Sequence, residues 1–367
     1  MRQDFGNAAV TRRVAFVGPL PPPVHGFSNI CAHVLELLTA GSAVEVFDRA
    51  PRANNAVLGR IAQLFQPFRY IAWCLEGGGA SLYLALSGGK GQFFDWPYVI
   101  VAKVFRSRIF IHHHSFAYLN SPTFFNKVFF ALVRRETHIA LSQGMRLALS
   151  RTYGLDLDVV KIVSNAAFYA SMKADRKLEA DSSAPICVGF LSNVTFEKGF
   201  VEFFEVLSQL KKRGVAYKAL IAGPVSQDAS GRFFQLIASS SDTVYLGPIY
   251  GDAKDRFYDQ LDIFLFPTQY ANEAEPLVIH EALRSSVQVI ACDRGAIAEM
   301  LGNGAGLVFT KEDFVRGATV HIERLDHDRA QLKAAQRLSQ EQFQRIRRDA
   351  QTAMASVLDE ISGPAAA

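Results

Sequence analysis

Two glutamates eight residues apart form the part of the sequence best suited to chemistry. Glu273 follows an apolar run that ends at Pro267, and Glu281 lies further on, beyond Pro276. Because proline lacks a backbone N–H and fixes φ near its helical value, Pro276 indicates the first turn of a helix. The free N–H groups at a helix start favour an anionic diphosphate. One carboxylate before that helix and one inside it can then bind hydroxyls on both sides of the phosphates.

A nucleoside-diphosphate sugar has such hydroxyls on its hexose and on its ribose, so this ligand fits the pattern. A loop glutamate and a solvated helix glutamate without function are the alternative. In a second segment, Lys198 and Gly199 open a helix after an apolar strand that ends at Leu191. Lysine is a compact cation that can neutralise a diphosphate, and glycine permits close backbone approach. For Lys198 the alternative is an ordinary lysine at a helix entry.

Two strand ends in the first half also carry candidate residues. The motif GPLPPPVHGFSN leads through a proline-rich loop to Gly26, which starts a helix and can lie against a phosphate or sugar. In the motif IHHHSF, strand alternation puts His112 and His114 on one face and His113 on the other. Since ligands bind at the ends of parallel strands, these histidines are candidates for ligand contact. Structural packing is one alternative, and zinc binding is another, although no third and fourth ligand with suitable spacing is evident.

These segments lie in an alternation of apolar runs and helical stretches, the pattern of parallel sheets covered by helices. Strands are expected over 14–18, 44–48, 81–87, 108–114, 137–142 and 159–165, and then over 186–192, 218–224, 243–248, 262–268, 287–293 and 306–310. Helices are expected near 26–39, 95–106, 121–134, 143–153 and 326–359. The polar segment 170–184 separates the two series and is the expected linker. The sequence thus predicts an α/β fold with two Rossmann-like domains, 1–170 and 171–340, facing a cleft.

The segment 266–300 resembles the E-x7-E region of the family-4 retaining glycosyltransferases, which have the GT-B fold. Here the motif reads Glu273-Ala-Glu-Pro-Leu-Val-Ile-His-Glu281 and is followed by VIACDRGAIAEM. The resemblance covers nearly the whole chain and is strongest over 186–300. It implies that the first domain binds the acceptor and the second binds the nucleotide-sugar donor. It also implies that the last helix, about 341–367, packs back on the first domain.

The resemblance further implies three catalytic residues. Lys198 would stabilise the leaving diphosphate, Glu273 would contact the donor sugar, and His114 would reach that sugar from the first domain. Donor binding is expected from Gly26, Asn193, Gly223, Gly247, Tyr250, Glu275, Leu277, Val278 and Glu281. In this set Glu281 would bind the ribose, while the backbone from Glu275 onward approaches the diphosphate. The family usually has an arginine near Asn193, so Lys198 lacks that cationic partner here.

Other features limit the class of protein. No run of about eighteen apolar residues suits a membrane-spanning helix, and the N-terminus lacks the apolar centre of a secretory signal. The cysteines form no CxxC pair and are expected to be reduced, mostly buried thiols of a cytoplasmic protein. They are Cys31, Cys74, Cys187 and Cys292. The triplets Asp156-Leu-Asp158 and Asp326-His-Asp328 are expected to be solvated pairs, so catalysis without a metal or other cofactor is predicted.

Charge is distributed unevenly along the chain. The whole chain has 39 Lys and Arg against 35 Asp and Glu, whereas residues 1–170 have 17 against 9. A basic, aromatic-rich first half suits an anionic membrane surface or a phosphorylated lipid, and a solubilising charge distribution is the alternative. The segment FFNKVFFALVRR, 124–135, fits peripheral membrane contact, or else a core helix with a basic end. Nucleic acid is not an expected partner, because no long Lys/Arg tract occurs.

The sequence therefore predicts a retaining hexosyltransferase that uses a UDP- or GDP-linked sugar and a glycan or lipid-linked acceptor. Surface polysaccharide synthesis of the bacterial type is the expected pathway, at the inner face of the membrane. A nucleotide-sugar 2-epimerase of the same fold and a non-catalytic sugar-nucleotide-binding protein are the alternatives.

Overall fold

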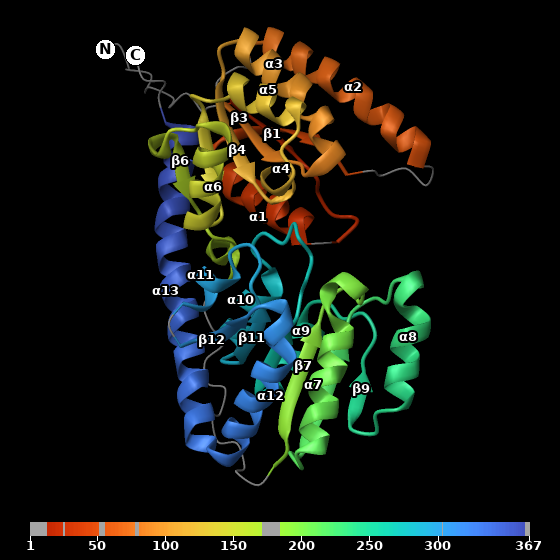
Figure 1. Cartoon of the computed structure of the whole chain (residues 1–367). Coiled ribbons are helices and arrows are strands. Elements are labelled where there is room, and N and C mark those ends of the chain that lie inside the picture. The colour runs from red at the N-terminus through yellow and green to blue at the C-terminus, as the bar shows by residue number, and fades with distance from the viewer. Residues whose placement is uncertain are drawn as a thin grey trace, which may run out of the picture. The chain divides into compact units, whose positions relative to one another are not determined.

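The computed structural model describes residues 13–24, 26–50, 56–77, 81–170, 184–302 and 304–363. The chain divides into two compact units between Val163 and Ser164, and the chain after Asp349 returns to the first unit. Each unit is built on a six-stranded sheet whose strands pair in parallel, with helices around it (Figure 1). Parallel strands need helical crossovers, which explains the strict alternation of strands and helices.

Unit 1 has the strand order β2-β1-β3-β4-β5-β6. Its strands are β1 (Arg13–Gly18), β2 (Ala43–Asp48), β3 (Ser81–Leu86), β4 (Arg108–His113), β5 (Thr137–Ala140) and β6 (Val160–Ile162). Its helices are α1 (Gly26–Gly41), α2 (Ala56–Leu75), α3 (Trp96–Val104), α4 (Ala117–Asn120), α5 (Phe124–Leu132) and α6 (Gln143–Tyr153), with the 3-10 turns η1 (Gly89–Phe94) and η2 (Leu157–Val159). Figure 1 shows α2, α3 and α5 together on one side of the sheet and α1 on the other.

Unit 2 has the strand order β12-β11-β10-β7-β8-β9. Its strands are β7 (Ile186–Leu191), β8 (Tyr217–Ala222), β9 (Thr243–Tyr245), β10 (Ile263–Phe266), β11 (Gln288–Cys292) and β12 (Gly306–Phe309). Its helices are α7 (Phe200–Lys212), α8 (Gln227–Ala238), α9 (Asp252–Asp259), α10 (Leu277–Arg284), α11 (Ile297–Leu301) and α12 (Lys311–His327), with the 3-10 turns η3 (Asn165–Phe168) and η4 (Phe196–Lys198). One apolar core joins the sheet to α7, α8 and α12, and a second joins it to α9, α10 and α11.

The last helix, α13 (Arg329–Ser362), contributes to both units. In unit 2, Arg347 Nε donates to the carbonyl of Tyr169 at 2.7 Å. In unit 1, the carbonyl of Ile361 accepts hydrogen bonds from the Ser81 hydroxyl at 3.0 Å and from Arg108 at 2.8 Å. The end of this helix is therefore anchored at the first residues of the central strands β3 and β4 of unit 1, which are far from it in sequence.

The division between the units falls earlier than the boundary expected at residue 170. Ser164 and Asn165 hydrogen-bond to the side chain of Glu275, and the Tyr169 hydroxyl donates to the carbonyl of Leu277. These bonds place residues 164–169 with unit 2. Most of the expected linker, residues 171–183, lies outside the described residues.

All twelve expected strands are present, with ends shifted by a few residues at most. The four cysteines are free and buried. The expected helix over 326–359 is wrong in its start: α12 ends at His327 and α13 begins at Arg329. The physical reason is Asp328, whose carboxylate accepts from the backbone N–H of Gln331 at 3.0 Å and so caps the second helix.

Candidate active site

The loops after the central strands of unit 2 pack backbone against backbone. Gly199 has φ +80°, and a Cβ there would lie 2.1 Å from the carbonyl oxygen of Pro267. Gly223 has φ +125°, and a Cβ there would lie 1.8 Å from the carbonyl oxygen of Ser192. Only glycine fits such positions. The loops that follow β7, β8 and β10 are thereby held together at the carboxyl edge of the sheet, where ligands bind in folds of this kind.

Lys198 and Glu273 meet at this edge, as the sequence pattern suggested. Lys198 ends η4, and its Nζ lies 2.5 Å from Oε2 of Glu273. The same carboxylate oxygen accepts a hydrogen bond from the Thr268 hydroxyl at 3.2 Å. The Lys198 ammonium also lies 4.8 Å from the ring centroid of Tyr270. With side chains 19% and 12% exposed, the pair is shielded from water yet open on one side.

Helix α10 begins beside this pair. Pro276 is the residue before the first helical residue rather than the first itself, and its carbonyl accepts from Ile279 N at 3.1 Å. Its fixed φ of −67° still directs the chain into the helix. The N–H groups of Leu277 and Val278 precede this first bond and have no partner inside the helix, so they can bind an anion.

Glu281 lies within α10 and forms a second cation–carboxylate pair. Its Oε1 lies 2.5 Å from Nζ of Lys254, and its Oε2 accepts from the Tyr258 hydroxyl at 3.1 Å. The Tyr169 hydroxyl is 3.5 Å from Oε1. Burial, and then the charge of Glu281, raises the pKa of both tyrosines well above the usual value. Both phenols therefore stay protonated. The Tyr258 hydroxyl can donate to the carboxylate, whereas the Tyr169 hydroxyl donates to the carbonyl of Leu277 and lies beside the carboxylate.

The side chain of Glu275 is directed into unit 2 itself. It is buried, and its oxygens accept from Asn165 N at 2.6 Å and from the Ser164 hydroxyl at 2.5 Å. His280 Nε2 lies 3.1 Å from Oε1. This side chain holds the entry to unit 2 in place, so only its backbone is left for the donor contact that the resemblance implies at this position.

The remaining donor-binding predictions in unit 2 lie on neighbouring loops. Gly247, with φ +72°, accepts at its carbonyl from Gly223 N at 2.9 Å, which brings these two glycines together. Asn193 is exposed on the loop after β7, and Tyr250 is exposed before α9. Their contact with a donor stays a prediction.

The histidines of β4 divide between two faces as strand alternation predicts. The rings of His112 and His114 lie 4.1 Å apart on one face. On the other, His113 is 3.0 Å from His138 and 2.7 Å from the Tyr118 hydroxyl. All these residues belong to unit 1.

His114 is the histidine proposed to reach a sugar. It packs on Phe27, next to Gly26 at the start of α1, with 4.6 Å between ring centroids. Burial lowers its pKa well below the usual value, so the imidazole is neutral near pH 7. Its buried Nε2 has no hydrogen-bond partner among the described residues. The group suits a neutral hydrogen bond to a hydroxyl, and that role stays a prediction.

Neither aspartate triplet resembles a metal site. The Asp156 carboxylate accepts from the backbone of Asp158 at 3.2 Å and caps η2. Asp326 pairs with Arg329 at 2.6 Å. Among the described residues, no cluster of three or more His, Cys, Asp or Glu could hold a metal ion. No helix in the described part of the chain is long and apolar enough to cross a membrane.

Solved structures resemble the chain over almost its full length. HepE from Anabaena, in complex with UDP and glucose, matches 95% of this chain and 100% of its own, with TM-score 0.71 and 17% identity. A glycosyltransferase from Rickettsia africae matches 97% and 100%, with TM-score 0.72 and 15% identity. Sucrose-phosphate synthase from Thermosynechococcus elongatus matches 95% and 99%, with TM-score 0.69 and 14% identity.

The chain has the GT-B fold. Residues 172–345 of this GT-B chain match the family model of the glycosyl transferases, group 1. That segment contains Lys198, Glu273, Glu281 and the helix start between the two glutamates. No curated protein sequence matches the chain significantly.

Several side chains of this GT-B site were not singled out from the sequence, among them Lys254, Tyr258 and Thr268. Lys254 and Tyr258 lie four residues apart on α9 and so share a face, which was a usable signal. Thr268 follows β10 directly, at the strand end where ligands bind. Which carboxylates these side chains would meet depends on how α9 and α10 pack, which no local pattern specifies.

Proposed function

We propose that the chain is a retaining glycosyltransferase that uses a UDP- or GDP-linked sugar, without a metal or other cofactor. The observation that carries this proposal is the Lys198–Glu273 pair, 2.5 Å apart next to the start of α10, within the segment that matches the glycosyl transferases, group 1. HepE, which shares the fold, was solved with UDP-glucose. We further propose a cytoplasmic protein at the inner membrane face, with a glycan or lipid-linked acceptor of bacterial-type surface polysaccharide synthesis.

The two pairs suit the two ends of such a donor. The bond between the anomeric carbon and the diphosphate oxygen breaks, and its electron pair leaves with that oxygen. Lys198 and the first N–H groups of α10 stabilise this negative charge. When the donor is bound, the Lys198 ammonium contacts phosphate in place of the Glu273 carboxylate. The Thr268 hydroxyl still donates a hydrogen bond to that carboxylate. Glu273 can accept from sugar hydroxyls, and Glu281 from those of the ribose. The acceptor oxygen bonds to the anomeric carbon on the face that the leaving group vacates, and its hydroxyl proton passes to the departing diphosphate oxygen.

Thermal unfolding with a panel of nucleotides and nucleotide sugars tests donor binding. A ligand at about 100 times its Kd stabilises the folded state by about 2.7 kcal/mol. We expect a higher Tm with one nucleoside diphosphate and its sugar, unchanged by EDTA. The matching sugar nucleotide, incubated with acceptor fractions, should then give a product with a retained anomeric configuration. No shift with any donor contradicts the proposal, and conversion of the donor without acceptor indicates the 2-epimerase instead.

Lys254→Ala is expected to weaken nucleotide binding by about 10-fold, the usual effect of losing one charge-assisted contact. Lys254 holds Glu281, which is proposed to bind the ribose. The substitution should therefore weaken the binding of uridine or guanosine as much as the binding of the nucleoside diphosphate. The measurement is the Kd of the nucleoside and of the nucleoside diphosphate by calorimetry. Lys212→Ala, at the exposed end of α7, is the control. If only the nucleoside diphosphate binds more weakly, Lys254 contacts the phosphates rather than acting through Glu281.

A further inference from the structure

Helix α5 in unit 1 is apolar on its outer side as well as its inner side. Phe129 and Phe130 are buried in the core, whereas Phe124 and Phe125 are 76% and 54% exposed. Val128 and Leu132 continue the exposed row at one-turn intervals. The sequence left open whether this segment is a core helix or a membrane-contacting one. A core helix accounts for only the inner of its two apolar sides.

Neighbouring elements extend the exposed row. Trp96 at the start of α3 packs edge-on against Phe129 of α5, with ring centroids 5.6 Å apart, so the two helices lie side by side (Figure 1). The ring centroids of Phe93, in η1, and Phe125 lie 5.0 Å apart. Ile100 and Val104, four residues apart on α3, are also exposed. The apolar face consists of Phe93, Ile100, Val104, Phe124, Phe125, Val128 and Leu132.

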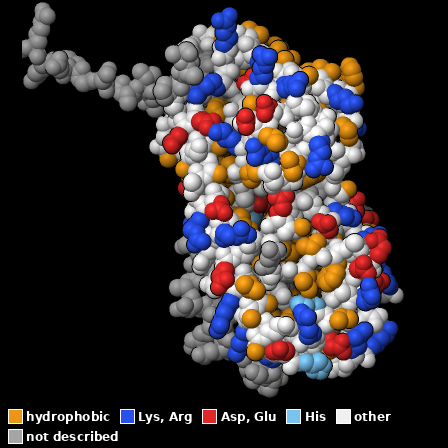
Figure 2. All heavy atoms as spheres, turned by 60° about the vertical axis from the view of Figure 1, so that its left-hand side comes forward, with side chains coloured by type: hydrophobic (Ala, Val, Ile, Leu, Met, Phe, Trp, Pro, Cys, Tyr) orange, Lys and Arg blue, Asp and Glu red, His pale blue; other side chains and the backbone are white. Residues whose placement is uncertain are grey.

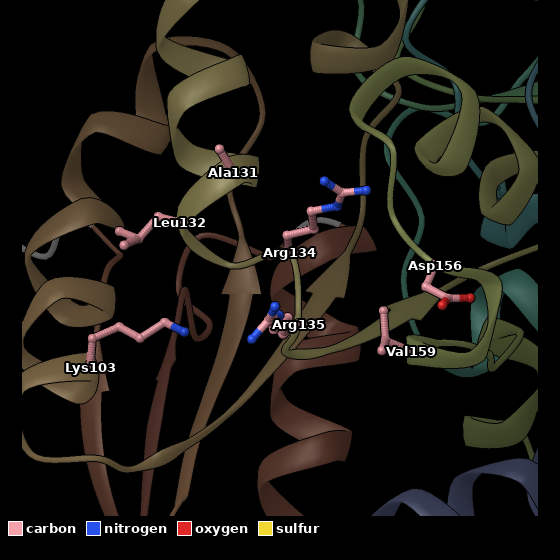
Figure 3. A pocket seen from close by; sticks show the side chains of 7 residues that line it. All are labelled: Lys103, Ala131, Leu132, Arg134, Arg135, Asp156 and Val159. Atoms are coloured by element: carbon pink, nitrogen blue, oxygen red, sulfur yellow. The ribbon is translucent and has the colours of Figure 1, made fainter.

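A basic pocket adjoins this apolar face at the end of α5. It has a volume of about 540 Å³ and is lined by Lys103, Ala131, Leu132, Arg134, Arg135, Asp156 and Val159. Leu132 belongs to both the pocket and the apolar face. In Figure 3 the ends of Lys103 and Arg135 point toward each other, and the single carboxylate, Asp156, lies away from them on the other side.

The cations of the pocket differ in how they are held. Lys103 pairs with Glu136, and Arg134 Nε donates to the carbonyl of Gly154 at 2.9 Å. Arg135 is exposed and forms no hydrogen bond or ion pair with any residue that the structure describes. Its guanidinium, which can bind a phosphate through two parallel N–H groups, is thus available to an external anion.

The charge around the apolar face is predominantly positive. Residues 89–136 contain seven Lys and Arg against two acidic residues, Asp95 and Glu136, and Glu136 pairs with Lys103. Asp95 is fully buried and pairs with Arg49, so it does not offset the surface charge. On the face of unit 1 visible in Figure 2, Lys and Arg side chains lie among hydrophobic ones, together with Asp and Glu side chains. A surface with both properties suits an interface that is apolar inside and negatively charged outside.

We propose that the apolar face of unit 1 docks on an anionic lipid bilayer. Its aromatic side chains enter the boundary between headgroups and acyl chains. The basic pocket then holds the phosphate of a lipid headgroup, with Arg135 as the principal contact. The docking rests on the proposed function, because a protein held at the bilayer meets a lipid-linked acceptor there. The test of the docking measures lipid binding and uses no sugar transfer.

Sedimentation with lipid vesicles tests the docking on the full-length protein. We expect binding to vesicles of phosphatidylcholine with about one third phosphatidylglycerol, weaker binding to phosphatidylcholine alone, and release as salt is raised. Lys127→Gln/Arg135→Gln should reduce partitioning by about 30-fold, from the usual contribution of two basic residues near a charged membrane. Phe124→Ser should reduce it by about 10-fold or more, since one large apolar side chain no longer enters the bilayer.

The control is Lys211→Gln/Lys212→Gln on α7 of unit 2, which makes the same charge change and should bind vesicles like the wild type. Lys127 and Arg135 have no hydrogen bond or ion pair with described residues, so their loss should leave the fold intact. Tm shifts with the donor nucleotide check this in every variant. Absent vesicle binding, or equal binding by all variants, overturns the docking. Because donor binding is measured separately, that result leaves the proposed transferase function standing.

Discussion

Lys198→Ala is expected to lower kcat by at least about 100-fold while changing the KM for the donor much less. Removing one preorganised group that stabilises developing negative charge typically costs about 100- to 1000-fold in kcat. Lys198 is only 19% exposed, so water screens its charge weakly. Charge on the leaving diphosphate is greatest as the bond breaks, so the loss should be larger in the transition state than in donor binding. Steady-state kinetics with the donor found in the thermal panel measures both constants.

Two further variants serve as matched controls for this substitution. Lys198→Arg retains the cation and should recover part of the turnover, and Lys212→Ala removes an exposed cation of α7 without effect. In the alanine variant Thr268 still donates to Glu273, but this shielded carboxylate loses its cation, so a lower Tm without ligand is expected and kcat is compared well below that Tm. If kcat stays within about threefold of the wild type, Lys198 is not the group that stabilises the leaving diphosphate.

The sequence predicted the positions of the strands because parallel strands buried on both faces are continuous apolar runs. In β7, β10 and β11 every residue is buried, and the polar residues of the candidate site begin directly after these runs. The order of residues along the chain was therefore enough to assign Lys198 and Glu273 to one sheet edge. Helix α2 lies between two expected strands and contains Pro67, although proline normally argues against a helix interior.

The partners of the predicted residues could not be read from the sequence in the same way. From the sequence, only the backbone of Glu275 was assigned to the donor and nothing was predicted for its carboxylate, which is bound by Ser164 and Asn165, about 110 residues earlier. Glu281 is held by Lys254 of α9 and by Tyr169, which precedes β7. Such pairs arise from how α9 and the entry to unit 2 pack on α10. A periodic pattern encodes which face of a helix is buried, but not which polar side chain from another element will meet it.

The partners of the histidines in unit 1 could not be read from the sequence either. Their hydrogen bonds predict how the stability of the protein depends on pH. Alternation separated His113 from His112 and His114, but the partner of His113 is His138 on the adjacent strand. The carbonyl of Val133 can only accept, so His138 Nε2 donates to it at 3.0 Å and Nδ1 is left to accept from His113. His113 in turn accepts from the Tyr118 hydroxyl. A proton added to His138 would set two donors against each other, so the chain of bonds requires neutral rings.

We therefore expect the protein to lose stability steeply as pH falls below about 6.5, the ordinary pKa of histidine. Burial lowers the pKa of His112 to about 3 and that of His138 to about 4, and those of His113 and His114 lie well below the usual value. Between these values and about 6.5 the unfolded chain binds protons that the folded chain does not. Stability is therefore complete above about 6.5 and falls by about 1.4 kcal/mol per pH unit for each histidine.

From pH 6.5 to 4.5 each of these histidines should lower the free energy of unfolding by about 2 kcal/mol. The loss from all four then approaches the whole stability of an ordinary domain. Denaturant titrations at several pH values measure this slope. The informative variant is His138→Gln, because an amide can still donate to Val133 and accept from His113 but takes up no proton. Its stability should fall less steeply with acid, by about one proton, even if it is lower at pH 7. Parallel pH curves for the variant and the wild type would show that His138 is already protonated, or already free to be, in the folded protein.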